Sequence, residues 1–411
     1  MAYLGSTPAR APLSSAQIED GTIDTADLAT NAVTTAKITA ANVTTAKIAD
    51  ANVTAAKVSS DVAQLGKNLI HNGAFTVAQR GTVTDIGGSG DDQILDRWLF
   101  VSGGGGTGRV TASQDALSVA NRAVTGQGYA LKIDCTTAES AVAASEAMWL
   151  TQRIEAQNLQ GLKYGNAAAE TVTLSFYYSS PKTGAHFVAA KQDDGTDTYI
   201  REFTIAVADT LEFFQVTFPG DSTGTIDNNS GAGFSITFPI ISGSTYNGTK
   251  DTWTGSSSQY NTSDQQNLLD NTANNIYITG VQLEVGTVAT DFEHEDYGTT
   301  LTKCLRYFWR WTGDADNDAP GLIHTVTTNR GVSEFQGVPM RAAPTVSLGG
   351  TVPDMPDATG GTVVSLNATQ DDQNFGNHMI HWVLSSATAD ESSRLRFATA
   401  DTDYIQWSAE L

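Results

Sequence analysis

The most regular pattern in the chain is an aliphatic residue at every fifth position near the N-terminus. The residues between are small or polar, as in NAVTTAKITAANVTTAKIADANVTAAKV. Five residues advance an α-helix by about 500°, so these side chains would not share one helical face. In a strand, an odd spacing sends alternate side chains to opposite faces. The series comprises Leu13, Ile18, Ile23, Leu28, Val33, Ile38, Val43, Ile48, Val53 and Val58.

This spacing is satisfied when three chains lie about a common axis, or when the backbone coils once per pentad. Burial within one chain cannot offset an ordering entropy of roughly 1–2 kcal/mol per residue, because the aliphatics are sparse. We therefore predict a trimeric stalk over residues 13–65, with the aliphatics from Ile18 to Val58 as its core. A flexible Thr/Ala-rich linker and a single-chain solenoid remain the alternatives.

After the repeat, the sequence consists of short segments with β character that are separated by Gly, Asp, Asn and Ser. Examples are NLIHNGAFTVAQ, TVTLSFYYSS, GFSITFPII and NIYITGVQLEV. In TVTLSFYY, the side chains of Val172, Leu174 and Phe176 would share one face of a strand. This pattern predicts an antiparallel β-sandwich of the jelly-roll kind over residues 66–296.

A second β-rich region follows over residues 297–411. It opens with LTKCLRYFWRW, in which Leu301, Leu305 and Phe308 could lie along a short helix, and it ends on YIQWSAEL. The predicted fold class is therefore mainly β: a fibrous trimeric stalk, then a jelly-roll β-sandwich, then a small C-terminal β domain.

Charge and cysteine content exclude several classes of protein. Acidic residues outnumber basic residues by 45 to 23, for a net charge of −22, so a nucleic-acid backbone would be repelled. The two cysteines, Cys135 and Cys304, form neither a disulfide framework nor a metal-ligand spacing, and we expect buried thiols. Neither a leader peptide nor a membrane-spanning run is apparent, so we expect assembly in the cytoplasm without membrane insertion.

Side chains that could carry out catalysis are few. Glu284, Glu293, Glu295 and Asp296 form an acidic run, and paired carboxylates can hydrolyse glycosidic bonds. The more favoured interpretation is a solvated hinge or a site for a structural cation. Common hydrolase, metalloprotease and nucleotide-binding motifs do not occur. We therefore predict a protein that is not an enzyme and has no cofactor, with a structural calcium ion left open.

Two regions combine aromatic and polar residues in the way that sugar-binding sites do. The segment STYNGTKDTWTGSSSQYNTSDQQN contains Tyr246, Trp253 and Tyr260, and WRWTGDADNDAP contains Trp309 and Trp311. Aromatic rings stack on the C–H face of a pyranose, while carboxylates and amides bind its hydroxyls. These five aromatics are the glycan-binding candidates, with structural packing or trimer contact as the alternative.

Several segments resemble the tail-fibre and tail-spike-like receptor-binding proteins of bacteriophages. They are MAYLGSTPA, the VTTAKIADA repeats, NLIHNGAFTVAQRGT followed by DRW, ITGVQLEVGTVATDFEHEDYGTTLTKCLRYFWR, MRAAPTV and YIQWSAEL. The resemblance implies a virion-attachment peptide over residues 1–12, a trimeric shaft, a jelly roll like a carbohydrate-binding module, and a receptor-binding tip over residues 297–411.

On this resemblance we expect a structural protein of the virion tail that attaches the phage to its host as a homotrimer. Its partners would be other virion proteins at the N-terminus and a host surface glycan or envelope protein. A structural head fibre or connector, and a tail spike that depolymerises polysaccharide, are the alternative functions.

Overall fold

The computed structural model describes residues 24–28, 67–312, 321–350, 362–372, 377–385, 387–389, 392–395 and 403–411. The chain divides into two compact units, Met1–Ala63 and Gln64–Leu411. In the first unit, a 3-10 helix spans Thr25–Asp27, and the side chain of Leu28 is exposed. The other predicted stalk aliphatics lie outside the described residues, so the trimeric stalk stays a prediction.

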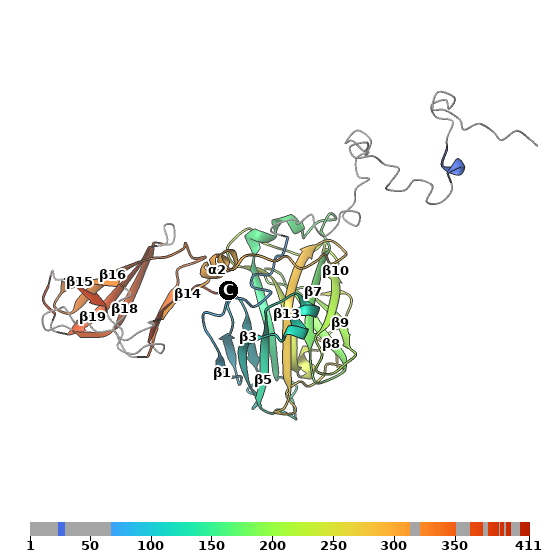
Figure 1. The fold of residues 1–411 in the computed structure, drawn as a ribbon, viewed down its shortest axis with the longest axis horizontal. Helices are drawn as coiled ribbons and strands as arrows, with labels where there is room; N and C mark the ends of the chain where they lie inside the picture. Colours follow the sequence, from blue (N-terminus) through green and yellow to red (C-terminus); the bar gives the residue numbers. More distant parts are fainter. Residues whose placement is uncertain are drawn as a thin grey trace, which may run out of the picture. The chain divides into compact units, whose positions relative to one another are not determined.

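Residues 67–296 form a β-sandwich, hereafter the sandwich (Figure 1). Its strands are β1 Val83–Ile86, β2 Gly90–Gln93, β3 Leu99–Gly103, β4 Arg109–Ala116, β5 Tyr129–Thr137, β6 Ala147–Glu155, β7 Val172–Ser179, β8 Gly184–Gln192, β9 Thr198–Ile205, β10 Glu212–Phe218, β11 Ala232–Ser242, β12 Trp253–Thr254 and β13 Asn275–Val285. A six-stranded sheet has the order β1-β4-β5-β13-β7-β10, and a seven-stranded sheet has the order β12-β9-β8-β11-β6-β3-β2. Helix α1, Val119–Thr125, connects β4 to β5, and 3-10 helices span Ala156–Leu162 and Ser244–Tyr246.

The core of the sandwich lies between the two sheets, as the alternation of TVTLSFYY predicts. Val172, Leu174 and Phe176 of β7 are all fully buried. The ring of Phe176 lies 5.1 Å from the rings of Phe203 and Phe238, which belong to the opposite sheet. Each such buried side chain contributes about 1.5–3 kcal/mol. The predicted mainly β fold with a jelly-roll sandwich is confirmed.

The segment NLIHNGAFTVAQ was expected to be a strand and is instead a turn. Asn72 and Phe75 have φ of 55° and 54°, a left-handed conformation that interrupts a strand. The Asn72 side chain donates to the carbonyls of Val77 and Asp96, and its own oxygen accepts from the Val77 amide. The side chain of Asn72 therefore organises this turn. The apolar residues around it made the segment look like a strand in the sequence.

The short helix predicted in LTKCLRYFWRW is present, but the face that it buries differs from the predicted one. Helix α2 spans Tyr297–Leu305 and begins where the Asp296 carboxylate accepts from the amide of Thr299. Its buried side chains are Thr300 and Cys304, whereas Leu301 and Leu305 are only half-buried. Phe308 lies beyond the helix, in the next strand. Both cysteines are buried free thiols, as expected.

The C-terminal region contains two further antiparallel sheets (Figure 1). Their strands are β14 Phe308–Thr312, β15 Gly321–Thr327, β16 Arg330–Gln336, β17 Thr345–Gly349, β18 Thr362–Asp372, β19 Asn377–Ser385, β20 Ser392–Leu395 and β21 Tyr404–Ser408. The three-stranded sheet has the order β14-β21-β17, and the five-stranded sheet has the order β18-β19-β16-β15-β20. Trp382 and Trp407 are fully buried in their shared core.

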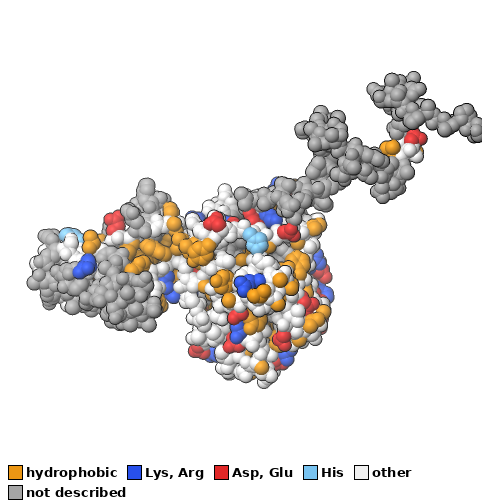
Figure 2. Space-filling model, in the orientation of Figure 1, with side chains coloured by type: hydrophobic (Ala, Val, Ile, Leu, Met, Phe, Trp, Pro, Cys, Tyr) orange, Lys and Arg blue, Asp and Glu red, His pale blue; other side chains and the backbone are white. Residues whose placement is uncertain are grey.

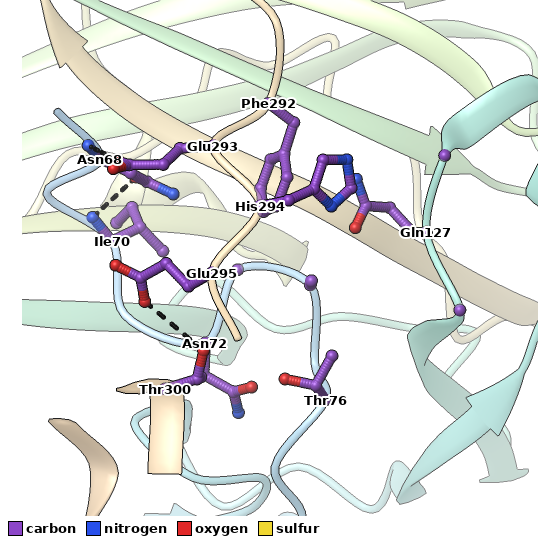
Figure 3. Close-up of a pocket in the computed structure, with 14 residues that line it drawn as sticks. Asn68, Ile70, Asn72, Thr76, Gln127, Phe292, Glu293, His294, Glu295 and Thr300 are labelled. Atoms are coloured by element: carbon purple, nitrogen blue, oxygen red, sulfur yellow. Dashed lines mark hydrogen bonds between the residues drawn. The ribbon is translucent and has the colours of Figure 1, made fainter. Parts of the chain in front are cut away.

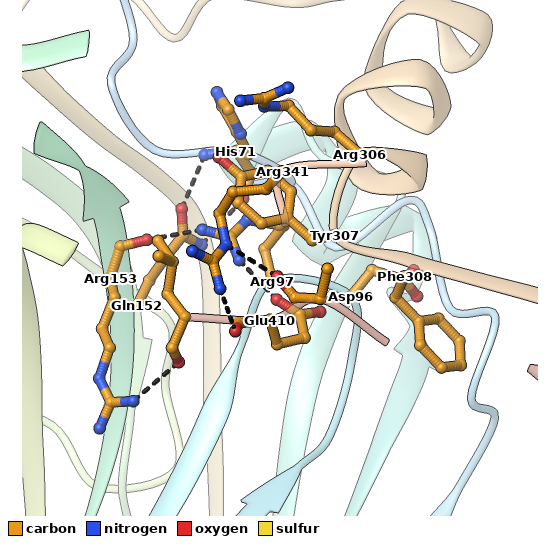
Figure 4. Close-up of polar contacts among 12 residues, drawn as sticks. His71, Asp96, Arg97, Gln152, Arg153, Arg306, Tyr307, Phe308, Arg341 and Glu410 are labelled. Carbon is orange, nitrogen blue, oxygen red and sulfur yellow. Dashed lines mark hydrogen bonds and ion pairs between the residues drawn. The ribbon is translucent and has the colours of Figure 1, made fainter. Parts of the chain in front are cut away.

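Buried ion pairs hold the three-stranded sheet against the sandwich (Figure 4). Glu410 accepts from Arg80 at 3.1 Å and from Arg97 at 2.5 Å. Arg306 donates two hydrogen bonds to Glu155 of β6, and the Tyr307 hydroxyl donates a third. Burial opposes ionisation of Glu155, but these donors lower its pKa and keep it charged. The boundary at residues 296–310 is therefore a packed junction.

Candidate functional site

The outer face of the seven-stranded sheet carries a second, smaller apolar cluster. Along β6, Met148 and Leu150 point into the sandwich core, so Trp149 points outward. The segment 243–262 covers this face with two tyrosines. The outer-face cluster comprises Trp149, Ala185, Phe187, Ala189, Ile200, Tyr246 and Tyr260.

Trp149 is the centre of an aromatic group within this cluster. Its ring lies 4.8 Å from that of Tyr260 and 5.4 Å from that of Tyr246. The Tyr246 hydroxyl donates to the carbonyl of Ser145, and the Tyr260 hydroxyl donates to that of Ser257. Burial raises the pKa of Tyr260 to about 12, so its hydroxyl stays protonated. Because Tyr260 is 7% exposed, the aromatic surface that remains open belongs to Trp149 and Tyr246.

A row of polar side chains crosses the same face, four residues further along β6 than Trp149. Ser235 of β11 is paired with Arg153 of β6 on one side and with Lys191 of β8 on the other. Arg153 forms an ion pair with Asp91 at 3.4 Å, and Lys191 forms one with Asp193 at 3.0 Å. The second carboxylate oxygen of Asp193 is buried and has no hydrogen-bond partner among the described residues. The row therefore offers two cationic donors, whereas the unpaired oxygen of Asp193 is closed to solvent.

The segment 243–262 brings two of its three predicted aromatics to this face. Tyr246 and Tyr260 meet Trp149 there. Trp253 instead forms the edge strand β12, where its ring packs 5.2 Å from Tyr199 and 5.9 Å from Tyr164 against the sandwich core. Its indole N–H donates to the carbonyl of Pro219. Glycan binding by these residues stays a prediction, with Trp253 the least available of the three.

Trp149 was missed because it lies in the run AMWLTQRIE, where apolar residues on both sides conceal its alternation. A period of two along β6 separates it from Met148 and Leu150, and this was the available signal. Lys191, Arg153 and Asp193 were missed because only the strand register brings them together.

The two C-terminal candidates lie on β14. The ring of Trp309 stacks on that of Trp407, with 4.3 Å between centroids, and Trp311 packs against the same core. Both are half-buried. The aspartates that follow them belong to residues 313–320, outside the described residues. Receptor binding by this pair also stays a prediction.

The acidic run has structural partners. Glu284 accepts from Gln282 and Thr290, Glu295 pairs with Lys303, and Asp296 caps α2. Glu293 accepts from the amide of Asn68. In the described part of the chain, no group of three or more His, Cys, Asp or Glu side chains is placed to hold a metal ion. The acidic run is therefore not a solvated hinge. It is part of a scaffold that holds residues 67–68 and α2 in place.

Beside this run lies a polar pocket of about 110 Å³ (Figure 3). Glu293, His294 and Glu295 line one side, and Asn72, Thr76 and Gln127 line another. The two carboxylates already accept the hydrogen bonds named above. The pocket lies apart from the aromatic group at Trp149.

In the described part of the chain, no helix has the length and apolarity needed to cross a membrane.

Comparison with known proteins does not assign the chain to a family. No protein-family model matches it, and no curated protein matches it. Among solved structures, a tailspike domain of bacteriophage CBA120 is similar at 12% identity and a TM-score of 0.27, covering 54% of this chain and 22% of that chain.

Two further solved structures are similar over about half of this chain. A putative sugar-binding protein from Bacteroides thetaiotaomicron has 16% identity and a TM-score of 0.30, covering 53% of this chain and 100% of its own. A family 11 carbohydrate-binding module of Clostridium thermocellum has 14% identity and a TM-score of 0.25, covering 51% and 99%. Similarity at this level assigns neither ligand nor activity.

Proposed function

We propose that the chain is a bacteriophage adhesion subunit that binds a host-surface glycan on the outer face of its seven-stranded sheet. The observation that carries this proposal is the open aromatic pair of Trp149 and Tyr246 on the same sheet face as Arg153 and Lys191. The resemblance of the sequence to phage fibres supplies the biological setting.

This face has the chemistry that a sugar ring requires. The open ring of Trp149 stacks on the C–H face of a pyranose, while the polar row meets hydroxyl groups at its edge. Arg153 and Lys191 donate to hydroxyl oxygens.

The proposed adhesin works as a homotrimer in the virion tail, after assembly in the host cytoplasm. Residues 1–12 attach it to other virion proteins, and the pentad repeat of residues 13–65 holds three chains together. Three equal faces binding one repetitive surface convert modest single-site affinity into avidity. The function requires neither a cleaved bond nor a cofactor.

Glycan-array binding by the full chain tests the proposal. Trp149→Ala should reduce binding at least about fivefold, since a stacked aromatic contributes about 1 kcal/mol or more. Trp253→Ala is the matched control, because its ring packs toward the sandwich core and should leave binding unchanged. Equal binding by wild type and Trp149→Ala would reject the site, and release of reducing ends from bound polysaccharide would show an enzyme instead.

A further inference from the structure

The polar pocket beside the acidic run lies where β13 separates from β5 (Figure 3). β13 pairs with β5 as far as Ile278, which lies opposite Leu131, and then continues along β7 alone. Its pairing with β7 shifts register between Thr279 and Gln282, where Gly280 has a φ of 61°. Such β-bulges often lie next to binding sites, because they end the pairing of a strand and redirect its side chains.

Three segments form the walls of the pocket around this bulge. The turn before β1 is fixed to the bulge, because the Gly73 carbonyl accepts from the amide of Val281 and the Asn68 side chain donates to the Val281 carbonyl. Residues 126–128, which follow α1, and residues 292–295 form the other walls. The pocket volume is about 110 Å³. Since a cavity of about 150 Å³ holds benzene, this volume suits a group of roughly four non-hydrogen atoms.

Gln127 brings a buried and largely unpaired carboxamide to this pocket. The residue is 2% exposed, and its side-chain nitrogen donates to the Thr125 carbonyl at the long distance of 3.4 Å. Its carboxamide oxygen accepts no hydrogen bond from the part of the chain that the structure describes. The side chain packs on the bulge, since a Cβ on Gly280 would lie 3.6 Å from it, and Figure 3 shows it beside the ring of His294. Burying an unpaired polar group costs free energy, so a ligand that pairs with this carboxamide is favoured.

The rest of the lining selects a neutral ligand with an apolar part. The carboxylates of Glu293 and Glu295 oppose the entry of an anion, and Glu295 is already paired with Lys303. Ile70 is 3% exposed and Phe292 is half-buried, and both offer apolar contact. Figure 2 shows acidic and basic side chains scattered over the visible, described surface of the sandwich. The pocket therefore depends on local hydrogen bonds and apolar contact for recognition.

We propose that this pocket binds the acetamido group of a neutral N-acetylhexosamine, as a second glycan site apart from the face of the seven-stranded sheet. The acetamido N–H donates to the oxygen of the Gln127 carboxamide, and the acetamido carbonyl accepts from its nitrogen. The methyl group packs against Ile70 and Phe292. The exposed ring of His294 and the hydroxyl of Thr76 meet the pyranose at the rim. An acetamido group has the size that the pocket volume allows.

Saturation-transfer NMR of the full chain with N-acetylglucosamine tests this site. The acetyl methyl protons should receive the strongest saturation, and glucose should bind at least about fivefold more weakly, because it lacks both acetamido hydrogen bonds. Gln127→Leu should weaken binding of N-acetylglucosamine by at least the same factor. Gln160→Leu, which changes an exposed glutamine elsewhere on the sandwich, is the matched control and should leave binding unchanged. If Gln127→Leu does not fold, Thr76→Val removes a half-buried hydroxyl of the same pocket and should show the loss instead.

The outcomes separate this site from the proposed function. A loss with Gln127→Leu but not with Gln160→Leu supports the pocket. A loss with Trp149→Ala in place of Gln127→Leu puts the sugar on the other face and overturns the pocket. Equal binding of glucose, or a methyl group that receives no saturation, also overturns it, whatever the glycan array shows. Nε-acetyl-lysine carries the same acetamido group without a pyranose and should bind several-fold more weakly; equal binding would overturn a sugar as the ligand.

Discussion

Replacing Glu410 with alanine would leave two buried guanidinium groups without their carboxylate. Glu410 accepts from Arg80 and Arg97, and these three side chains are only 3–6% exposed. One nitrogen of each arginine already lacks a partner among the described residues. Removing the carboxylate therefore leaves positive charge in a dry junction (Figure 4).

The expected cost follows from this burial. Breaking a buried ion pair by removing one partner costs about 3–5 kcal/mol, most of it from the unpaired charge that remains. Here Arg80 lies 3.5 Å from the ring of Phe308, and Arg97 lies 3.4 Å from that of Tyr307. Because these rings offset part of the loss, we expect Glu410→Ala to lower the free energy of unfolding by about 3 kcal/mol.

Urea unfolding followed by tryptophan fluorescence measures this loss, since Trp407 of β21, three residues before Glu410, is fully buried. Glu170→Ala is the matched control. Glu170 pairs with Lys163 at 2.6 Å, but these side chains are 38% and 52% exposed, so the loss should be about 0–1 kcal/mol. If the two variants unfold within about 1 kcal/mol of each other, burial does not set the strength of the junction.

Three further outcomes are expected. Burial lowers the pKa of His186 from 6.5 to about 4, so the unfolded chain takes up a proton first as pH falls; His186 alone should reduce stability by about 3 kcal/mol between pH 6.5 and 4. His186→Phe should make the unfolding profile less steep by that amount, while the buried His71, whose pKa is lowered to about 3, keeps its own contribution; an unchanged slope would rule His186 out. Ile38→Asp with Ile48→Asp should convert a trimer to monomers by light scattering, since each buried unpaired charge costs several kcal/mol; an unchanged mass would contradict the stalk. Trp309→Ala should lower the unfolding free energy by about 3 kcal/mol through loss of the stack on Trp407; a change confined to receptor binding would place Trp309 in the binding site.

The fold was predictable where a local pattern decides which side chains are buried. Val172, Leu174 and Phe176 alternate, and they face the core as their spacing predicts. Local pattern was insufficient in α2, since positions 300 and 304 have the same spacing as 301 and 305. Packing against the sandwich buries Thr300 and Cys304, and the sequence of the helix alone does not indicate which pair of side chains is buried.

The candidate site was predictable only in part, for a related reason. Tyr246 and Trp253 look alike in the sequence, as aromatics within one polar segment. The edge strand β12 turns Trp253 toward Tyr199, while a hydrogen bond to Ser145 holds Tyr246 over the outer face. Trp149, the partner of Tyr246, lies about a hundred residues earlier, and only the strand order brings it close. Side chains joined by register cannot be grouped from spacing alone.

The junction and the candidate glycan face are structurally coupled, because Arg153 makes contacts in both. Its guanidinium donates to the carbonyl of Leu411, and its own carbonyl accepts from Arg97, which binds Glu410. The orientation of Arg153 on the candidate glycan face therefore depends on the segment that closes the junction. Since the same guanidinium reaches Asp91 on the outer face, a loosened junction would weaken glycan binding without any change among the aromatics. A side chain placed to meet a sugar hydroxyl is only as well ordered as its supports, and here those supports come from the last residues of the chain.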